Sequence, residues 1–302
     1  MNSTLPKVTT IGTFDGIHIG HQKILKQVVQ LAKTKGYIPV VLTLFPHPRM
    51  VLQKDDSIKL LNTIEERIEL LKTYGIEDVI VKTFTKDFAN LSAKDYVKQI
   101  LIDELNTKEI VIGYDHHFGK NRSANITDLL DFAKLYKFNV QEISAQDLEQ
   151  VTVSSTKIRT ALNLGQVALA NSYLGYNFFI SGTVIKGKGL GRTINFPTAN
   201  IHISASYKLI PNNGVYVVKS KINNKWVYGM MNIGTNPTVN GKTQSIEVHY
   251  FNFNKDLYNT EIKIEFLKRL RNEEKFKNIE VLKGQLYKDK EDAMAFINAL
   301  DE

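Results

Sequence analysis

Cysteine is absent from the 302-residue sequence, and so is any long apolar run. Without cysteine the chain can form no disulfide, no thiolate nucleophile and no thiolate metal site, which fits a reducing compartment. No apolar stretch approaches the roughly 20 residues that a helix needs to span a bilayer. The first ten residues, MNSTLPKVTT, also lack the apolar core of a signal peptide. We therefore expect a cytoplasmic protein with no membrane partner.

Composition and length describe an ordinary globular protein with a modest excess of positive charge. The sequence is 43% hydrophobic and 23% charged, and its length suits two domains that each bury a core. The net charge is +8. Basic residues are scattered and no nucleic-acid-binding module is recognisable, so we expect no nucleic-acid partner. A plain basic surface and the binding of small anionic substrates both remain compatible with the charge.

Strand and helix patterns alternate through the first half of the chain. We expect strands at 8–14, 37–45, 78–84, 108–113 and 138–143, and helices at 22–35, 63–74, 92–105 and 126–136. Such alternation predicts a mostly parallel sheet with helices on both faces. Ligands of these sheets bind beyond the carboxyl ends of the strands, which points to the loops after Gly12, Phe45 and Gly113.

The second half of the chain has a different secondary-structure pattern. After a helix expected at 155–174, short strands separated by Gly, Asn and Pro begin near Phe178. Strand patterns lie at 215–222, 226–233, 246–253 and 261–266, and a helix at 279–300 closes the chain. This pattern predicts a small antiparallel β-barrel with a C-terminal helix. We therefore expect two domains, residues 1–176 and 177–302.

The segment Gly12-Thr-Phe-Asp-Gly-Ile-His-Ile-Gly-His21 joins the first strand to the first helix. His18 and His21 are three apart, so both can lie on one face at the helix N-terminus, where free N–H groups and the helix dipole favour an anion. Two imidazoles there can hydrogen-bond the phosphates of ATP and stabilise charge at the α-phosphorus during in-line attack, without a covalent intermediate. A lone loop histidine is usually structural, whereas this pair indicates a phosphate site.

This segment resembles the signature of the nucleotidyltransferase superfamily, and its G-T-F-D-G-x-H-x-G-H form is similar to the FAD synthetase branch. The resemblance implies a Rossmann-like nucleotidyltransferase domain in which His18 and His21 are catalytic. It also implies nucleotide or phosphate contacts from Gly12, Phe14 and Asp15.

Two later loops are similar to the same branch. In Phe45-Pro-His-Pro48 a rigid loop and a functional role are equally good interpretations, and the resemblance implies flavin contacts from Pro46, His47 and Pro48. Gly113-Tyr-Asp-His-His-Phe-Gly119 resembles a loop that contacts flavin and nucleotide, which implies a flavin contact from Asp115. Many members of the branch have Phe at the position of His116, so we assign no role to His116 or His117 and do not expect them to bind metal.

Val153-Ser-Ser-Thr-Lys-Ile-Arg159 resembles the second phosphate motif of the superfamily. Taken alone, its hydroxyls form only a helix cap. After this array of strands and helices they can hold an anion together with the amides of the helix start. Phosphate contacts are implied for Ser154, Ser155 and Thr156, and a bidentate catalytic clamp for Arg159.

Glycine, lysine and arginine gather between Gly182 and Asn200. The Gly-Lys-Gly-Leu-Gly portion is not a dinucleotide fingerprint, because no helix pattern follows, and the terminal Gly-Lys-Ser/Thr of a Walker loop is absent. A loop of this kind can still cover phosphates with backbone amides. We expect phosphate contacts from Gly187, Lys188 and Arg192.

Gly191-Arg-Thr-Ile-Asn-Phe-Pro-Thr-Ala-Asn200 resembles the riboflavin kinase signature, whose core is Pro-Thr-Ala-Asn. The resemblance implies that Thr198 and Asn200 hold Mg²⁺. This chain has Asn195 where most members have glycine, and we expect a slightly different turn there without loss of activity.

Glu247 and His249 share one face of the strand expected at 245–251. A carboxylate there can accept the proton of a hydroxyl that attacks the γ-phosphate, although most strand glutamates simply face solvent. The resemblance continues through this strand and implies that Glu247 is the catalytic base. It extends to Leu270-Arg-Asn-Glu-Glu-Lys-Phe276, where Arg271 and Phe276 are expected to contact flavin and an ordinary helix start is the alternative.

Together these resemblances cover residues 8–295 and imply two reactions. ATP would phosphorylate riboflavin to FMN in the second domain, and a second ATP would adenylylate FMN to FAD and pyrophosphate in the first, both with Mg²⁺. Riboflavin, FMN and ATP are then the small-molecule partners, FMN and FAD are bound products, and self-association is left open. Two alternatives are a single-activity enzyme and a flavin-binding protein without catalysis.

Overall fold

The computed structural model describes residues 5–53, 57–144, 153–187, 189–238 and 241–300. Contacts within the chain group it into two compact units, Met1–Ser155 and Thr156–Glu302. The division at 176/177 between two functional domains stays a prediction. In the described ranges, no helix is both long enough and apolar enough to cross a membrane.

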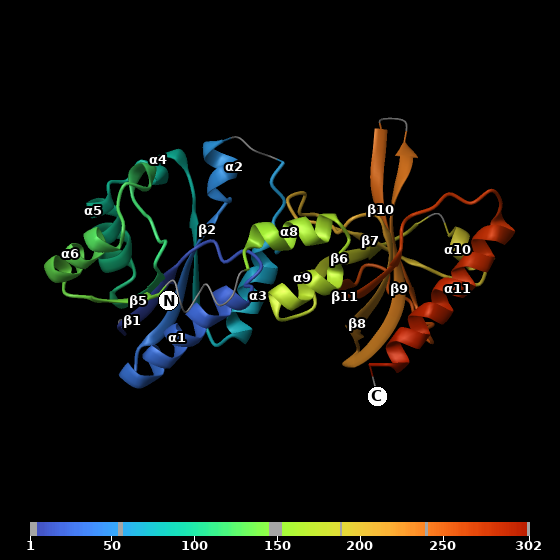
Figure 1. The fold of residues 1–302 in the computed structure, drawn as a ribbon, viewed down its shortest axis with the longest axis horizontal. Helices are drawn as coiled ribbons and strands as arrows, with labels where there is room; N and C mark the ends of the chain where they lie inside the picture. The colour runs from blue at the N-terminus through green and yellow to red at the C-terminus, as the bar shows by residue number, and fades with distance from the viewer. Residues whose placement is uncertain (1–4, 54–56, 145–152, 188, 239–240, 301–302) are drawn as a thin grey trace. The chain divides into compact units, whose positions relative to one another are not determined.

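The first unit is built on a five-stranded sheet in the order β3-β2-β1-β4-β5 (Figure 1). Every neighbouring pair is parallel, which confirms the prediction. The order reverses at β1 and β4, and ligands of such sheets bind at that point, beyond the carboxyl ends of the strands. The strands are β1 (Lys7–Ile11), β2 (Ile38–Phe45), β3 (Asp78–Thr83), β4 (Thr107–Gly113) and β5 (Asn139–Ile143).

Helices connect these strands and cover the sheet with apolar side chains. Their described bounds are α1 (Ile19–Lys35), α2 (Pro48–Leu52), α3 (Ile64–Thr73), α4 (Lys86–Ala89), α5 (Ala93–Asp95) and α6 (Ile126–Tyr136). The helix expected at 92–105 begins as α5 and continues as a π-helical segment, Tyr96–Glu104. The capping box of α3 is present as predicted, because Thr63 and Glu66 each bond the other's backbone N–H.

The second unit is a closed barrel of six strands in the order β10-β7-β6-β11-β8-β9. All neighbouring pairs are antiparallel, so the predicted barrel is confirmed. Two of its strands, β6 and β7, have no counterpart among the four strand ranges predicted. The strands are β6 (Phe179–Ile185), β7 (Ala199–His202), β8 (Gly214–Ile222), β9 (Lys225–Thr238), β10 (Gly241–Tyr250) and β11 (Glu261–Arg271).

The helix predicted at 155–174 is wrong as a single element. It is divided into α8 (Ser155–Asn163) and α9 (Val167–Leu174). The break lies at Gly165, whose φ of 73° is a left-handed conformation that ends a helix. A substitution there would also be crowded, because a Cβ atom would lie 2.7 Å from Arg269.

The C-terminal helix α11 (Ile279–Asn298) packs against β9 and β11 on the outside of the barrel (Figure 1). Its buried residues Ala293 and Ile297 join a cluster that includes Val215 and Val217 of β8. The intervening residue of that strand, Tyr216, is also fully buried. Alternate side chains of a strand point to opposite faces, so β8 is buried on both sides.

Candidate active sites

The turn after β1 has an unusual backbone. Phe14 and Ile17 have φ values of 47° and 37°, and Gly16 between them has 84°. Left-handed backbone is uncommon for residues with a side chain, and for a β-branched residue it is an outlier. Both side chains are at most 2% exposed, so packing holds the turn in this conformation. Backbone strain of this kind gathers at functional sites, where the surrounding structure enforces it.

The histidine pair lies where this turn enters α1. His18 is the N-cap, and its Nδ1 accepts a hydrogen bond of 3.4 Å from the backbone N–H of His21. The two imidazoles stack with ring centroids 3.7 Å apart, and Phe14 lies 5.0 Å from the His21 ring. The structure thus brings the predicted pair together at the N-terminus of a helix. The cap also makes α1 begin at Ile19, three residues before the predicted start.

Both imidazoles are neutral near pH 7. Burial lowers the pKa of His18 to about 4, partly opposed by the charge of Asp15. Burial also holds the pKa of His21 well below its usual value, and the positive charge of Arg67, with that of His18 when it is protonated, lowers it further. Nδ1 of His21 is buried without a hydrogen-bond partner in the described part of the molecule. The pair can therefore donate hydrogen bonds to a ligand without carrying charge of its own.

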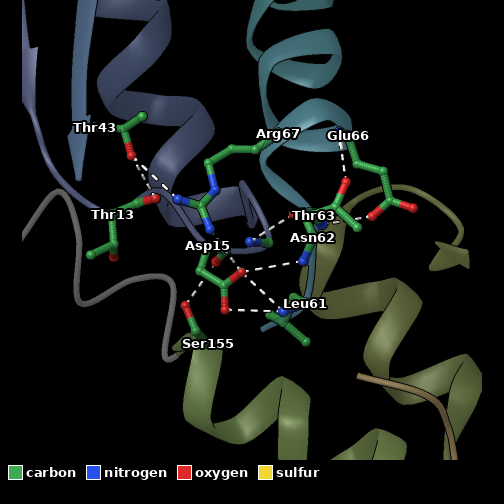
Figure 2. Close-up of polar contacts among 10 residues, drawn as sticks. Thr13, Asp15, Thr43, Leu61, Asn62, Thr63, Glu66, Arg67 and Ser155 are labelled. Carbon is green, nitrogen blue, oxygen red and sulfur yellow. Dashed lines mark hydrogen bonds and ion pairs between the residues drawn. The ribbon is translucent and has the colours of Figure 1, made fainter. Parts of the chain in front are cut away.

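Asp15 does not face solvent. Its side chain is 1% exposed, and its two carboxylate oxygens accept hydrogen bonds of 2.9 and 3.1 Å from the backbone N–H of Leu61 (Figure 2). The guanidinium of Arg67 lies 3.6 Å away. The carboxylate of Asp15 is therefore buried and bonded within the unit. The contact with nucleotide or phosphate that the sequence indicated for Asp15 stays a prediction.

The loops after β2 and β4 carry the predicted flavin contacts. His47 is the N-cap of α2, where its Nδ1 accepts from the N–H of Arg49 at 3.3 Å, and Pro48 is the first residue of that helix. Pro46 precedes this cap and is partly buried. Asp115 is exposed, and its backbone carbonyl contacts Nδ1 of His117 at 2.9 Å. The structure thus gives the first loop a rigid local geometry, which is compatible with either interpretation of it.

His116 is more buried than its neighbours in the loop after β4. Burial lowers its pKa to about 4, and its Nε2 is buried with no hydrogen-bond partner among the described residues. Its ring stacks 6.1 Å from Phe118. The imidazole therefore packs against an aromatic ring, a contact that the Phe of many FAD synthetase sequences at this position could also make.

The second phosphate motif begins at the first turn of α8. The hydroxyl of Ser155 donates a hydrogen bond of 2.8 Å to the backbone carbonyl of Asp15, which ties the motif to the turn after β1 (Figure 2). Ser154 and Thr156 are exposed, and Arg159 is partly buried.

Hydroxyl, amide and carboxylate groups meet on the barrel between β7 and β10. The hydroxyl of Thr198 donates a hydrogen bond of 3.1 Å to Oε2 of Glu247. Glu247 is paired across the two strands with Asn200, so the two side chains lie on the same face. His249 lies on that face too, and its Nδ1 contacts the carbonyl of Pro197 at 2.8 Å. The sequence predicted this shared face, and the structure shows it together with the Pro-Thr-Ala-Asn segment.

The glycine-rich loop packs onto this cluster. A Cβ atom on Gly187 would collide with the side-chain amide of Asn200, so a larger residue would displace this amide. Lys188 lies outside the described residues. Leu190–Thr193 form a short helix, α10, which the sequence did not predict. Asn195 has a φ of 64°, a conformation that glycine adopts freely and that asparagine tolerates better than most residues.

A cavity of about 570 Å³ opens beside Thr198. Arg192 lines it, and its Nη2 donates a hydrogen bond of 2.9 Å to the hydroxyl of Tyr258. The opposite wall comes from residues 253–258, which the sequence reasoning missed. That segment includes a second cation, Lys255, and no motif marks it. Only its closeness in space to the glycine-rich loop identifies it as part of a site.

Arg271 is held away from solvent by a buried partner. Its Nε and Nη2 donate to the two carboxylate oxygens of Asp289 on α11, at 2.8 and 2.7 Å. The ring of Phe276 lies 5.6 Å from the guanidinium. The structure thus brings the two predicted flavin contacts together, with Nε and Nη2 of the arginine directed at Asp289 and Nη1 donating to the backbone carbonyl of Asn272 at 3.0 Å.

These two constellations define a class of protein. One unit presents a neutral histidine pair at a helix N-terminus on a parallel sheet. The other presents hydroxyl, amide and carboxylate oxygens beside a cavity whose lining includes the cations Arg192 and Lys255 and the carboxylate of Asp256. Both arrangements suit anionic phosphates, and the chain is a two-unit transferase of phosphate-containing groups.

Comparison with known proteins narrows this class to one family. The family model described as FAD synthetase matches residues 2–157, and the one described as riboflavin kinase matches residues 174–297. A protein of Bacillus subtilis (strain 168) named bifunctional riboflavin kinase/FMN adenylyltransferase is 41% identical over 97% of this chain and 93% of its own length. A protein of Escherichia coli (strain K12) with the same name is 36% identical over 96% of this chain and 92% of its own. The chain belongs to the bifunctional riboflavin kinase/FMN adenylyltransferase family.

A solved structure shares the fold. The crystal structure named as a macrolide-efflux protein from Streptococcus pneumoniae has a TM-score of 0.86 and 31% identity, and the match covers 96% of this chain and 94% of that one. Its name differs from those of the sequence relatives, and we take from it only the architecture.

Proposed function

We propose that this chain makes FAD from riboflavin in two ATP-dependent steps, one in each unit. In the barrel, the 5′-hydroxyl of riboflavin attacks the γ-phosphorus of ATP and releases ADP. In the sheet unit, a phosphate oxygen of FMN attacks the α-phosphorus of a second ATP and releases pyrophosphate. The observation that carries this proposal is that each unit has its own cluster of phosphate-binding groups, in the order in which the two family models match the chain.

Glu247 is the base of the first step. A primary alcohol is a weak nucleophile at neutral pH, and a positioned base that takes its proton typically contributes about 10² to 10⁴ in rate. Support comes from the hydrogen bond of Thr198 to Oε2, which restricts the orientation of the carboxylate. Oε1 then remains for the hydroxyl of riboflavin.

Mg²⁺ is the metal of the kinase step, and the residues present fit it. Mg²⁺ prefers hard oxygen ligands and is usually held by few protein groups plus waters and substrate phosphates. Thr198 and Asn200 supply such oxygens beside Glu247, while the described residues contain no cluster of three or more His, Cys, Asp or Glu side chains suited to a metal. When bound, the ion neutralises charge that develops on the phosphate oxygens.

The cavity beside Thr198 receives the nucleotide of the first step. Its volume of about 570 Å³ lies within the roughly 300 to 1,000 Å³ typical of small-molecule sites. Arg192 and Lys255 line it and supply positive charge for phosphates. Gly187 and Lys188 are further phosphate contacts on this proposal, and Lys188 lies outside the described residues. The half-buried ring of Tyr258, which lines the cavity, gives the adenine an apolar surface.

His18 and His21 act in the second step. As neutral donors at a helix N-terminus, they hydrogen-bond the α-phosphate oxygens as charge develops on them. Gly12 and Phe14 of the first motif are further nucleotide contacts on this proposal. In the second motif, Ser154, Ser155 and Thr156 contact phosphate and Arg159 clamps it. Asp15 supports this site from within the unit.

The flavin contacts complete the proposal. Pro46, His47, Pro48 and Asp115 bind FMN in the sheet unit. Arg271 and Phe276 order the C-terminal segment over the flavin of the barrel, with Arg271 acting through its pair with Asp289. The enzyme is cytoplasmic on this proposal, and self-association is not required by either step.

Product analysis tests the proposal. The purified chain is incubated with riboflavin, ATP and Mg²⁺, and the flavins are separated by chromatography. We expect FMN to form first and FAD to follow. FMN without FAD, even from added FMN, would reduce the chain to a kinase, and bound riboflavin without turnover would make it a flavin-binding protein.

A further inference from the structure

A buried ion pair lies beneath the turn that carries the histidine pair. Nη2 of Arg67, on α3, is 3.6 Å from Oδ1 of Asp15, and each side chain is 1% exposed. Figure 2 shows both groups at the centre of a set of hydrogen bonds. A buried pair is weak evidence for net stability, because desolvation of the two charges offsets their attraction. What distinguishes this pair is the backbone that it holds.

Asp15 ties one side of the turn to the segment before α3. Its Oδ1 accepts hydrogen bonds from the backbone N–H of Leu61 at 2.9 Å and of Asn62 at 3.3 Å. The side chain of Asn62 returns the contact, since its Oδ1 accepts from the N–H of Gly16 at 2.9 Å. Asn62 is 1% exposed, so these bonds are shielded from water. They fix the backbone two residues before His18.

Arg67 reaches the other side of the turn through Thr43 of β2. Its Nη1 donates to Oγ1 of Thr43 at 3.4 Å, and the threonine hydroxyl donates in turn to the backbone carbonyl of Thr13 at 3.1 Å. Thr43 is fully buried. The guanidinium therefore contacts both sides of the turn. Its Nη2 lies near Asp15, and its Nη1 is linked to Thr13 through the hydroxyl of Thr43.

The turn needs such support because its backbone is strained. Phe14 and Ile17 both have left-handed φ values, and conformations of this kind persist only where the surroundings enforce them. Without this support the turn would shift, and the N-cap His18 would move together with its imidazole, which stacks on the ring of His21. Misplacement of a reacting group by about 1 Å can cost on the order of 10²-fold in rate.

We infer that Arg67 is a positioning residue for adenylyl transfer: through Asp15 and Thr43 it fixes the turn that presents His18 and His21 to the nucleotide. This inference rests on the proposed function of the sheet unit. Arg67 touches neither flavin nor ATP on this account and acts only through the turn.

The charges of the pair also bear on the imidazoles. The carboxylate of Asp15 raises the pKa of His18, while the guanidinium of Arg67 and the ring of His18 lower that of His21. Protonation of His18 at Nδ1 would remove the acceptor of the His21 N–H and undo the cap. Loss of the Arg67 charge should therefore raise the pKa of His21 and make FAD formation more sensitive to acid.

Two substitutions separate geometry from charge. Arg67→Lys keeps the positive charge but cannot form both arms of the contact, because lysine lacks the planar fork. Arg67→Met removes the charge at similar length. The pair Asp15→Asn/Arg67→Met also removes the stranded carboxylate, so it remains informative if Arg67→Met does not fold. Lys72→Met is the matched control, since Lys72 is an exposed cation on the same helix.

The assays follow FAD formation from FMN and ATP, with kcat and KM measured from about pH 5 to pH 8, the range in which imidazoles titrate. FMN formation from riboflavin by the same preparations is the internal control. For Arg67→Met we expect kcat to fall on the order of 10²-fold, with much smaller changes in KM, and an acid limb that moves to higher pH. Arg67→Lys should lower kcat less and keep the wild-type pH profile. The double variant should regain stability without regaining kcat.

Three results would overturn the inference. One is wild-type kcat and pH dependence in folded Arg67→Met. Another is recovery of kcat in the double variant, because that would make the stranded carboxylate the sole cause. The third is an equal fall of FMN and FAD formation together with early thermal unfolding. A wild-type enzyme that makes FMN but never FAD would instead refute the proposed function of this unit.

Discussion

Thr198 donates its hydroxyl to Oε2 of Glu247 over 3.1 Å, from the residue before β7 to the middle of β10. The two residues are 49 positions apart in the chain, so only closure of the barrel brings them together. One carboxylate oxygen is thereby occupied and oriented, and the proposed function assigns the other to the hydroxyl of riboflavin.

Thr198→Val should weaken FMN formation. Valine keeps the shape of threonine but removes the donor to Glu247 and the oxygen that we propose as a ligand of Mg²⁺. Loss of a group that orients or binds at a metal site typically costs about 10- to 100-fold. Steady-state assays with riboflavin as substrate measure the loss, and an increased Mg²⁺ requirement should accompany it. Unchanged kcat and Mg²⁺ dependence would remove Thr198 from the site.

His21→Ala should abolish most FAD formation and spare FMN formation. Removal of a preorganised donor to a transition-state oxygen typically costs about 10² to 10³ in kcat. The assay supplies FMN and ATP and measures FAD, with riboflavin phosphorylation by the same preparation as the control. Equal rates of FAD synthesis in variant and wild type would exclude His21 from the mechanism.

His116→Phe should make the protein less sensitive to acid. The pKa of His116 is about 4 in the folded state and near 6.5 unfolded, so the unfolded chain takes up the proton first as pH falls. The contribution of neutral His116 to the free energy of unfolding is therefore complete above pH 6.5, and it is lost progressively as the pH falls toward 4. At about pH 5 the loss is about 2 kcal/mol relative to neutral pH. Urea unfolding of both proteins at the two pH values checks this, and an identical pH dependence would contradict it.

A fragment that begins at Thr156 should be a more stable kinase than one that begins at Asn177. Both should phosphorylate riboflavin and neither should make FAD. The longer fragment keeps α9, whose Asn171 accepts from the N–H of Phe178 at 2.8 Å and donates to the carbonyl of Phe266 at 2.9 Å. Thermal unfolding and a kinase assay compare them. Absence of kinase activity in both folded fragments would show that the barrel does not act alone.

The elements that follow local patterns were predictable from the sequence. Hydrophobic periodicity and the capping box located the parallel strands and α3 to within a few residues, and α6 (Ile126–Tyr136) has the predicted bounds. The division of the predicted helix at 155–174 was missed, because an isolated glycine in a helical pattern does not reveal its φ. Gly165 has a left-handed φ, and it lies against Arg269, which is distant in the chain.

The parts of the sites that depend on distant contacts were not predictable. The sequence predicted that His18 and His21 lie side by side, because they are within one helical turn of each other. It could not show that Asp15 is buried on Arg67, because that contact joins a loop and a helix 52 positions further along the chain. The wall of the cavity at residues 253–258 was missed for the same reason, since its residues carry no motif of their own.

The central claim is that two independent active sites share this chain, and Glu247→Gln tests it most directly. Glutamine keeps the shape of the side chain and can still accept from Thr198, but it cannot take a proton from riboflavin. One folded preparation is assayed twice, with riboflavin and with FMN as the starting flavin. We predict that riboflavin phosphorylation falls by about 10²-fold or more, while adenylylation of FMN continues at the wild-type rate. Riboflavin phosphorylation close to the wild-type rate would contradict the role of Glu247, and an equal fall of both activities would contradict the two-site account.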